Sequence, residues 1–138
     1  MRILIVEDDI LGMQFLQAIL SQHGQCSTAV DGREAVQAYC QAVEESNPFD
    51  VIFMDIMMPV LNGLDALERI REFELFNAHR IPRSAIAVMA TATSDSQDVV
   101  RSYCCCSAFA YLVKPILAKD VHDVMARITM QLEAPPDS

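Results

Sequence analysis

Residues 51–63 read VIFMDIMMPVLNG, and this stretch decides the fold. Its first part predicts a strand over residues 50–54, because a short continuous apolar run bounded by turn residues is typical of a strand buried on both faces. Asp55 ends the run, and a loop with Asn62-Gly63 precedes a helix that we predict from about Leu64 to Phe73. The stretch therefore indicates a buried strand with a carboxylate at its carboxyl end.

The same alternation of short apolar runs and amphipathic segments extends in both directions. We predict strands over residues 2–6, 26–30, 50–54, 85–90 and 109–113. We predict helices over residues 10–22, 34–45, 64–73 and 119–132, and one more between the polar stretch 91–98 and the cysteine run. Five strands alternating with five helices predict an α/β domain whose parallel sheet is covered on both faces.

Hydrophobic periodicity assigns an inward face to the first two helices. The residues expected inward are Leu11, Phe15, Ile19 and Leu20 on the first, and Ala35, Val36, Tyr39 and Val43 on the second. We expect one domain over residues 1–132, long enough to bury a core without disulfides. Residues 133–138, with Pro135-Pro136, are expected to form a flexible tail.

The composition is globular and acidic, with 52% hydrophobic residues and a formal net charge of -9. Direct binding to nucleic acid is therefore disfavoured. No apolar stretch approaches the roughly 20 residues that span a bilayer, and the acids that follow the first strand argue against a signal peptide. We expect a cytoplasmic protein without membrane contact. Met1 directly ahead of the first strand favours a free N-terminus.

The cysteines and histidines suggest no metal site. The five cysteines are Cys26, Cys40 and the run Cys104-Cys105-Cys106. Their odd number makes a disulfide framework unfavourable, and adjacent cysteines on a helix diverge too far to share a metal. The three histidines, His23, His79 and His122, have no partners at metal-ligand spacing and are expected on the surface.

Polar side chains follow four of the predicted strands. Glu7 and Asp8 follow the first, Asp55 the third, Thr91 the fourth and Lys114 the fifth. The carboxyl ends of parallel strands meet at one edge of the sheet, which is where such folds bind ligands. Clustered carboxylates favour a hard cation such as Mg²⁺, which also takes phosphate oxygens as ligands. The sequence thus predicts a site for Mg²⁺ and a phosphoryl group.

Asp55 is the best candidate for a nucleophile at this site. An aspartate can form an aspartyl-phosphate, and the strand that ends at Asp55 is central in the expected order. Carboxylates ~4 Å apart repel by about 4 kcal/mol at an effective dielectric near 20, so a cation or Lys114 must compensate them. Mg²⁺, Lys114 and the Thr91 hydroxyl could together meet the three phosphoryl oxygens.

Four segments in this order carry a resemblance to a known family. Residues 3–9, 51–63, 89–92 and 111–115 resemble the receiver domain of two-component response regulators, and the likeness covers about residues 1–132. It implies a flavodoxin-like (βα)5 fold with a five-stranded parallel sheet in the order 2-1-3-4-5. It also implies phosphorylation of Asp55 by a sensor histidine kinase or a phosphotransfer protein. Such a domain is a signalling module and catalyses only its own phosphorylation and dephosphorylation.

The resemblance also implies roles for individual residues. Asp8 and Asp55 would ligate Mg²⁺ directly, Glu7 would act through water, and Met57 would offer its backbone carbonyl. Thr91 and Lys114 would contact the phosphoryl group. Thr91 and Tyr111 would form the switch pair: the hydroxyl moves toward the phosphate and the ring turns inward behind it.

Three further features follow from the likeness. The Lys114-Pro115 bond is expected to be cis. Met57 and Thr93 stand where receivers tune hydrolysis of the phosphate, and an apolar Met57 is expected to slow it. The sequence departs from the family before the fifth strand, where Phe109 and the nearby cysteines suggest an apolar docking patch.

Two other functions are weighed against this one. A haloacid-dehalogenase-like phosphatase also uses an aspartate nucleophile, a lysine and Mg²⁺, but it needs a second aspartate where Met57 stands. A flavodoxin-type FMN carrier needs a phosphate-binding loop after the first strand, where Glu7 and Asp8 would repel phosphate. The kinase, the downstream target, a dimer formed on phosphorylation and membership of a longer hybrid protein all stay open. The long connector between Asp55 and Thr91 resembles receivers attached to hybrid kinases.

Overall fold

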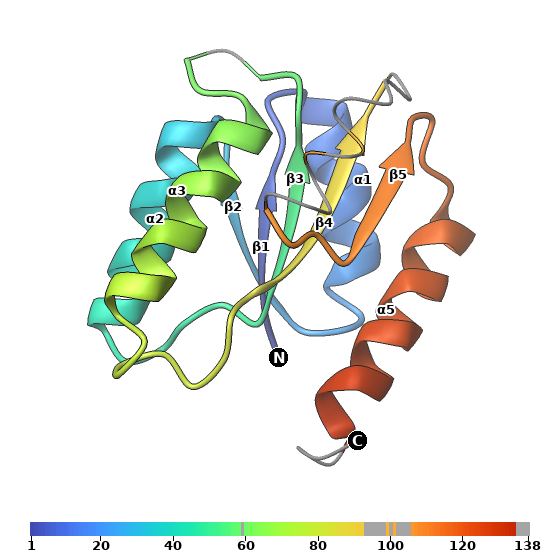
Figure 1. Ribbon diagram of the computed structural model, residues 1–138. Coiled ribbons are helices and arrows are strands. Elements are labelled where there is room, and N and C mark those ends of the chain that lie inside the picture. Colours follow the sequence, from blue (N-terminus) through green and yellow to red (C-terminus); the bar gives the residue numbers. More distant parts are fainter. Residues whose placement is uncertain (59, 93–98, 100, 102–105, 135–138) are drawn as a thin grey trace.

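The computed structural model describes residues 1–58, 60–92, 99, 101 and 106–134. In this part of the chain, one parallel sheet has the strand order β2-β1-β3-β4-β5 (Figure 1). The strands are β1 (Arg2–Val6), β2 (Gln25–Ala29), β3 (Val51–Asp55), β4 (Ile86–Thr91) and β5 (Ala110–Val113). The expected flavodoxin-like fold and its strand order are confirmed.

Helices cover both faces of the sheet (Figure 1). α1 (Ile10–Leu20) and α5 (Ala118–Glu133) lie on one face, and α2 (Gly32–Glu44) and α3 (Gly63–Phe76) on the other. Side chains of β1 alternate between these layers: Ile3 and Ile5 join the core under α1 and α5, whereas Leu4 and Val6 join the core under α2 and α3. Since both sides of each central strand are buried, the strand sequences are apolar throughout.

The inward face predicted for α2 is confirmed, but that of α1 is partly wrong. Leu11 is 75% exposed and Phe15 is 40% exposed. The buried residues of α1 are Leu16, Ile19 and Leu20. The inward stripe therefore begins at Met13, which packs partly against the core, and Leu11 lies outside it.

α3 is longer than predicted. It continues past Phe73 to Phe76, because Glu74 in its last turn is anchored by tertiary contacts. The buried Glu74 carboxylate accepts a hydrogen bond from the Tyr39 hydroxyl at 2.7 Å and another from the backbone N–H of Ala85 at 2.8 Å. The expected connector 74–84 therefore begins only after Phe76.

Two expectations fall at least partly outside the described residues. The fourth predicted helix and the cysteines Cys104 and Cys105 lie there, as does most of the expected tail. Glu133, which we assigned to that tail, is the last residue of α5. Cys106 is buried, and Cys26 and Cys40 are free thiols. Phe109 is half-buried against the core, with the Arg127 guanidinium 5.0 Å from its ring centre.

His23 and His122 are not the solitary surface residues that we expected. His23 Nε2 lies 2.8 Å from His122 Nδ1, which joins the turn after α1 to α5. The two rings are tilted by 51° with centres 5.0 Å apart. His79 is exposed, as expected.

Among the helices that the described residues form, none combines the length and apolar character of a membrane span.

Candidate functional site

The predicted site residues gather at the carboxyl edge of the sheet. Asp55 is the last residue of β3 and Thr91 the last of β4, while Glu7 and Lys114 directly follow β1 and β5. The strand register brings Asp55 beside Ala90 and Thr91 beside Val113. The edge is therefore assembled by strand pairing, as the sequence pattern predicted.

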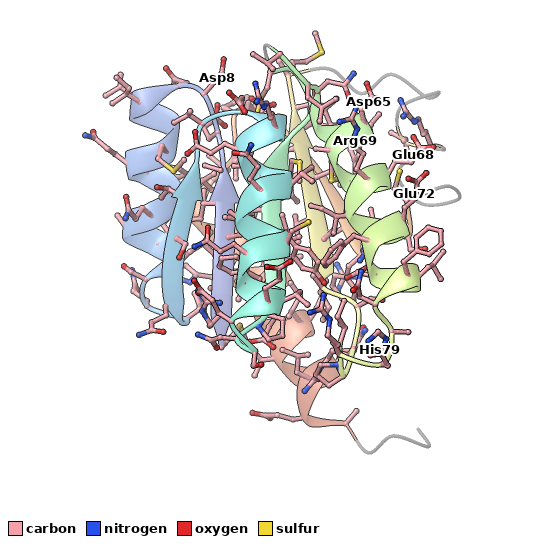
Figure 2. All side chains as sticks on the ribbon, turned by 90° about the vertical axis from the view of Figure 1, so that its left-hand side faces the viewer. Asp8, Asp65, Glu68, Arg69, Glu72 and His79 are labelled. Carbon is pink, nitrogen blue, oxygen red and sulfur yellow. The ribbon has the colours of Figure 1, made fainter. Side chains whose placement is uncertain are left out.

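Three carboxylates lie close together at this edge. Glu7, Asp8 and Asp55 each offer an oxygen atom, and these atoms all lie within 4.8 Å of one another. Glu7 and Asp55 are 2% and 5% exposed, whereas Asp8 is exposed and closes the cluster on the solvent side. Figure 2 shows Asp8 at the end of the molecule where β1 leads into α1. Two buried acids and one exposed acid thus face a common point.

Lys114 neutralises part of this charge. Its ammonium nitrogen lies 3.0 Å from Glu7 Oε2 and 3.2 Å from Asp55 Oδ2. Without it, two buried carboxylates would be held together uncompensated, a cost that proteins avoid. The lysine therefore bridges the acid after β1 and the acid at the end of β3.

The pKa shifts reflect the same balance. Burial raises the pKa of Glu7, the hydrogen bond from Lys114 opposes that shift, and the charge of Asp55 adds to it. For Lys114, burial acts to lower the pKa, but the hydrogen bond to Glu7 and the charges of Asp55 and Glu7 outweigh burial, so the pKa is raised. Lys114 is therefore firmly protonated near neutral pH.

Local backbone contacts fix the acids. Asp9 caps α1, since its side chain accepts a hydrogen bond from Gly12 N at 2.8 Å, and its own N–H donates to Glu7 Oε1 at 3.2 Å. Asp9 is thus the ordinary helix-start residue that we expected. On the neighbouring strand, the N–H of Met57 donates to Asp55 Oδ1 at 3.2 Å. One Asp55 oxygen contacts a backbone donor and the other contacts Lys114.

Gly63 is a residue whose role the sequence reasoning missed. A Cβ atom at this position would lie 2.2 Å from the carbonyl oxygen of Asp55. Only glycine allows α3 to begin this close to the end of β3, where the Gly63 N–H donates to Ile56 O at 2.9 Å. The signal was the Asn62-Gly63 pair, since Asn62 is the N-cap of α3.

The proposed switch residues lie on neighbouring strands. Thr91 is fully buried, and its carbonyl accepts a hydrogen bond from Lys114 N at 2.7 Å. Tyr111 pairs in register with Met89, two positions before Thr91, and packs partly against the core under α2 and α3. The Lys114-Pro115 bond is cis, as expected. Thr93 lies outside the described residues.

The donor set fits a hard divalent cation. Carboxylate oxygens are the ligands that Mg²⁺ prefers, and one or two of them usually suffice. Asp8 presents its carboxylate from the exposed side, so an ion could reach the cluster from solvent. Met57 follows the buried strand end, and its side chain is 62% exposed. The arrangement can therefore gather positive charge around an Asp55 oxygen.

The fold places this protein among α/β domains with a doubly wound parallel sheet. In the class that it matches, a central aspartate, a lysine and neighbouring acids share one site at the carboxyl edge of the sheet. Within that class the chain belongs to the response regulator receiver domain family, whose model matches residues 3–126.

Several relatives agree with this assignment. The chain is 32% identical to the chemotaxis protein CheY of Treponema pallidum over 92% of its own length and 81% of that protein. It is 32% identical to hybrid signal transduction histidine kinase I of Dictyostelium discoideum over 126 residues, which cover 90% of the chain. The chain spans only 7 to 20% of the length of that kinase and of the osmolarity protein SSK1 of Saccharomyces cerevisiae.

A solved structure shows the same fold in a complex. The receiver domain of S. cerevisiae Ssk1, crystallised with the histidine phosphotransfer signalling protein Ypd1, superposes with a TM-score of 0.77 at 30% identity. The match covers 95% of this chain and 90% of that one. A receiver domain from Clostridium thermocellum matches with a TM-score of 0.75 at 24% identity, which supports the fold.

Proposed function

We propose that this receiver domain accepts a phosphoryl group on Asp55 from a sensor histidine kinase or a phosphotransfer protein, with Mg²⁺, and signals through protein–protein contacts. The observation that carries the proposal is the setting of the Asp55 carboxylate. It is buried at the end of β3, lies 3.2 Å from the Lys114 ammonium and shares a cluster with Glu7 and Asp8.

The reaction would move one phosphoryl group between two proteins. A carboxylate oxygen of Asp55 attacks phosphorus, the bond from phosphorus to the donor imidazole nitrogen breaks, and an acyl phosphate forms. The electron pair of the broken bond stays on the imidazole nitrogen. The histidine leaves as neutral imidazole, with a proton that its other nitrogen already held or that it takes from solvent. Such a transfer depends on positioning and charge compensation, which the fixed Asp55 and Lys114 supply.

The acids would hold Mg²⁺. By the family pattern, Asp8 and Asp55 bind it directly, Glu7 acts through water, and Met57 contributes its backbone carbonyl. When bound, the ion neutralises charge on the phosphoryl oxygens. Lys114 already contacts both buried acids, so it would compensate a second phosphoryl oxygen.

The signal would pass through Thr91 and Tyr111. Thr91 is buried beside the acid cluster, and Tyr111 is half-buried on the adjacent strand. A hydroxyl drawn toward the phosphate leaves space behind it, and the ring of Tyr111 could fill that space. This would shift the population between two packings of one fold.

The surroundings of the site suit a protein donor. Ile10 and Leu11, in the first turn of α1 directly after the acids, are 73% and 75% exposed. Val60 and Leu117, in the loops after β3 and β5, are also exposed. Apolar side chains grouped beside a polar site mark a protein-binding surface. A phosphotransfer protein such as Ypd1, which binds the Ssk1 receiver, is the kind of partner this rim fits.

The test is phosphodonor labelling followed by intact mass measurement. Wild type incubated with acetyl phosphate and Mg²⁺ should gain the mass of one phosphoryl group, and Asp55→Asn should gain none. Asp50→Asn, at the opposite end of the same strand, is the matched control and should be labelled like wild type. Labelling of Asp55→Asn at an undiminished level would refute the assignment.

The same preparation separates a signalling domain from a phosphatase. Met57 stands where a haloacid-dehalogenase-like enzyme carries its second aspartate, and this apolar residue is largely exposed. We therefore expect a stable acyl phosphate and no multiple turnover of a phosphate ester such as p-nitrophenyl phosphate.

A further inference from the structure

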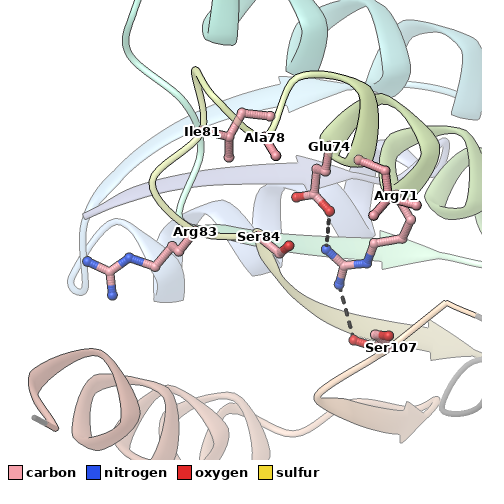
Figure 3. A pocket seen from close by; sticks show the side chains of 8 residues that line it. Arg71, Glu74, Ala78, Ile81, Arg83, Ser84 and Ser107 are labelled. Carbon is pink, nitrogen blue, oxygen red and sulfur yellow. Dashed lines mark hydrogen bonds and ion pairs between the residues drawn. The ribbon is translucent and has the colours of Figure 1, made fainter. Parts of the chain in front are cut away.

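A second concave site lies at the opposite edge of the sheet from Asp55. A cavity of about 430 Å³ opens between the end of α3, the segment leading into β4 and the segment leading into β5 (Figure 3). Leu75, Ala78 and Ile81 supply its apolar wall, and Arg83 and Ser84 lie on the side toward β4. Its volume is in the range of binding pockets in general.

The inner wall of this cavity is fixed by a hydrogen-bonded network. Arg71 donates to Glu74 Oε1 at 2.8 Å and to Ser107 O at 3.1 Å (Figure 3). It also donates to Ala85 O and Cys106 O, both at 2.8 Å. Tyr39 donates to the other oxygen of Glu74. All charge on this wall is therefore internally compensated. The cavity is formed before any partner arrives, so binding needs little rearrangement.

The rim carries uncovered apolar side chains. Leu75 and Phe76, adjacent residues in the last turn of α3, are 80% and 84% exposed. Leu75 also lines the cavity, so this apolar surface continues into it. Scattered exposed residues are ordinary, but an exposed leucine that lines a cavity beside a second exposed apolar residue indicates a binding surface.

The charge around the rim has the opposite sign from the rest of the domain. The chain carries a net charge of -9, yet residues 75–85, which lead from the end of α3 to β4, contain no Asp or Glu and include Arg80 and Arg83. Arg83 is exposed and makes no hydrogen bond or ion pair with another described residue. The Arg80 guanidinium donates only to Asn77 Oδ1 among the described residues. Two cations are thus available beside the apolar rim.

From these observations we propose that the cavity at the end of α3 is a docking site for an acidic protein segment with one large apolar side chain. The apolar side chain would enter between Leu75 and Ile81, and flanking carboxylates would face Arg83 and Arg80. The occupant is acidic because an unpaired arginine at an apolar groove selects carboxylates. The site is separate from Asp55, so this proposal does not depend on phosphorylation.

The experiment selects peptides and then maps where they bind. Random dodecapeptides displayed on phage are selected on the purified domain, and one enriched peptide is titrated into the ¹⁵N-labelled protein. Enriched sequences should place a leucine, methionine or aromatic residue beside two or more acids. Amide shifts should be confined to residues 75–84 and 107, and affinity should fall as salt is added.

Variants make the test specific. Arg83→Glu and Leu75→Ser should each weaken binding of the selected peptide by about tenfold. Arg33→Glu, an exposed arginine at the start of α2, is the charge-matched control and should bind like wild type. All three positions are exposed, so folding should be preserved, which thermal melts check. No enrichment of acidic peptides, shifts centred on Asp8 and Asp55, or full binding by Arg83→Glu would each overturn the proposal.

Discussion

Gly63 lies against the backbone of Asp55 so closely that a methyl group on the glycine would come within 2.2 Å of the Asp55 carbonyl oxygen. The start of α3 is thereby seated on the residue that we propose to be phosphorylated. The position of the Asp55 carboxylate at the end of β3 therefore depends on the absence of a side chain at residue 63.

Gly63→Ala should therefore lower both stability and labelling. Because the obstructing atom is backbone, it cannot rotate away, and we expect a loss of about 1–3 kcal/mol in the free energy of unfolding. Urea denaturation measures it, and acetyl phosphate labelling reports the displaced Asp55. Gly12→Ala is the control for stability alone: the nearest atoms to its Cβ would be side-chain atoms of Asp9 and Glu7, at 3.2 Å and 3.3 Å. A neutral Gly63→Ala would show that the contact is easily relieved.

Lys114→Gln should slow labelling of Asp55 by about a hundredfold, the typical cost of removing one charge-stabilising donor. The ammonium that contacts Glu7 and Asp55 would be lost while the length of the side chain is largely kept. The rate is measured with acetyl phosphate at saturating Mg²⁺. Lys119→Gln, on the exposed first turn of α5, should label at the wild-type rate. Equal rates for both variants would remove Lys114 from the chemistry.

Leu11→Ser should separate docking from chemistry. The side chain is 75% exposed beside the acids, so its loss should leave labelling by acetyl phosphate unchanged. Transfer from a phosphorylated histidine phosphotransfer protein should fall by about tenfold, as for an interface residue that contributes ~1.4 kcal/mol. Met130→Ser, an equally exposed apolar position on α5, is the control. A parallel loss with both donors would place Leu11 in the fold rather than in an interface.

Met57→Asn should shorten the lifetime of the phosphorylated domain severalfold. Met57 donates its N–H to Asp55 while its apolar side chain remains exposed, so it offers no group that could orient a water molecule. An asparagine amide could do so. The half-life is followed by intact mass after the donor is removed. An unchanged half-life would refute the idea.

The His23–His122 contact predicts a pH dependence of stability. Burial, followed by the charge of His122, lowers the pKa of His23 below its ordinary value of 6.5. The unfolded chain therefore takes up this proton at a higher pH than the folded chain does. The free energy of unfolding should decline as pH falls below about 6.5 and level off below the lowered pKa.

Denaturant titrations between pH 8 and pH 5 measure this decline. His122→Gln should flatten it, because the charge of His122 then no longer lowers the pKa of His23. His79→Gln, which alters an exposed histidine outside this pair, should retain the wild-type slope. If the free energy of unfolding declines equally with falling pH in all three proteins, other groups cause the decline.

The sheet and the acid site were predictable because each rests on a local pattern. A buried strand such as β3 must be apolar throughout, and the first polar residue after it marks the edge where neighbouring strands also end. Asp55, Thr91 and Lys114 therefore met in space as the order of motifs predicted.

Other features depend on contacts between distant segments. Leu11 obeys helical periodicity as well as Leu16 does, and only the position of α1 over the sheet decides which is buried. Glu74 reads as a solvent-exposed residue until Tyr39 and Ala85 are placed beside it. The His23–His122 pair joins residues 99 positions apart, which no local pattern records.

The short length of β3 bears on how many partners the domain can bind at once. Five residues from Val51 to Asp55 span roughly 15 Å, at about 3.3 Å per residue. The two surfaces that we propose for partners lie at opposite ends of this strand, so a partner bound at one end need not cover the other. Two proteins could thus bind the domain at the same time, and the domain would act as an adaptor that holds both in one ternary complex.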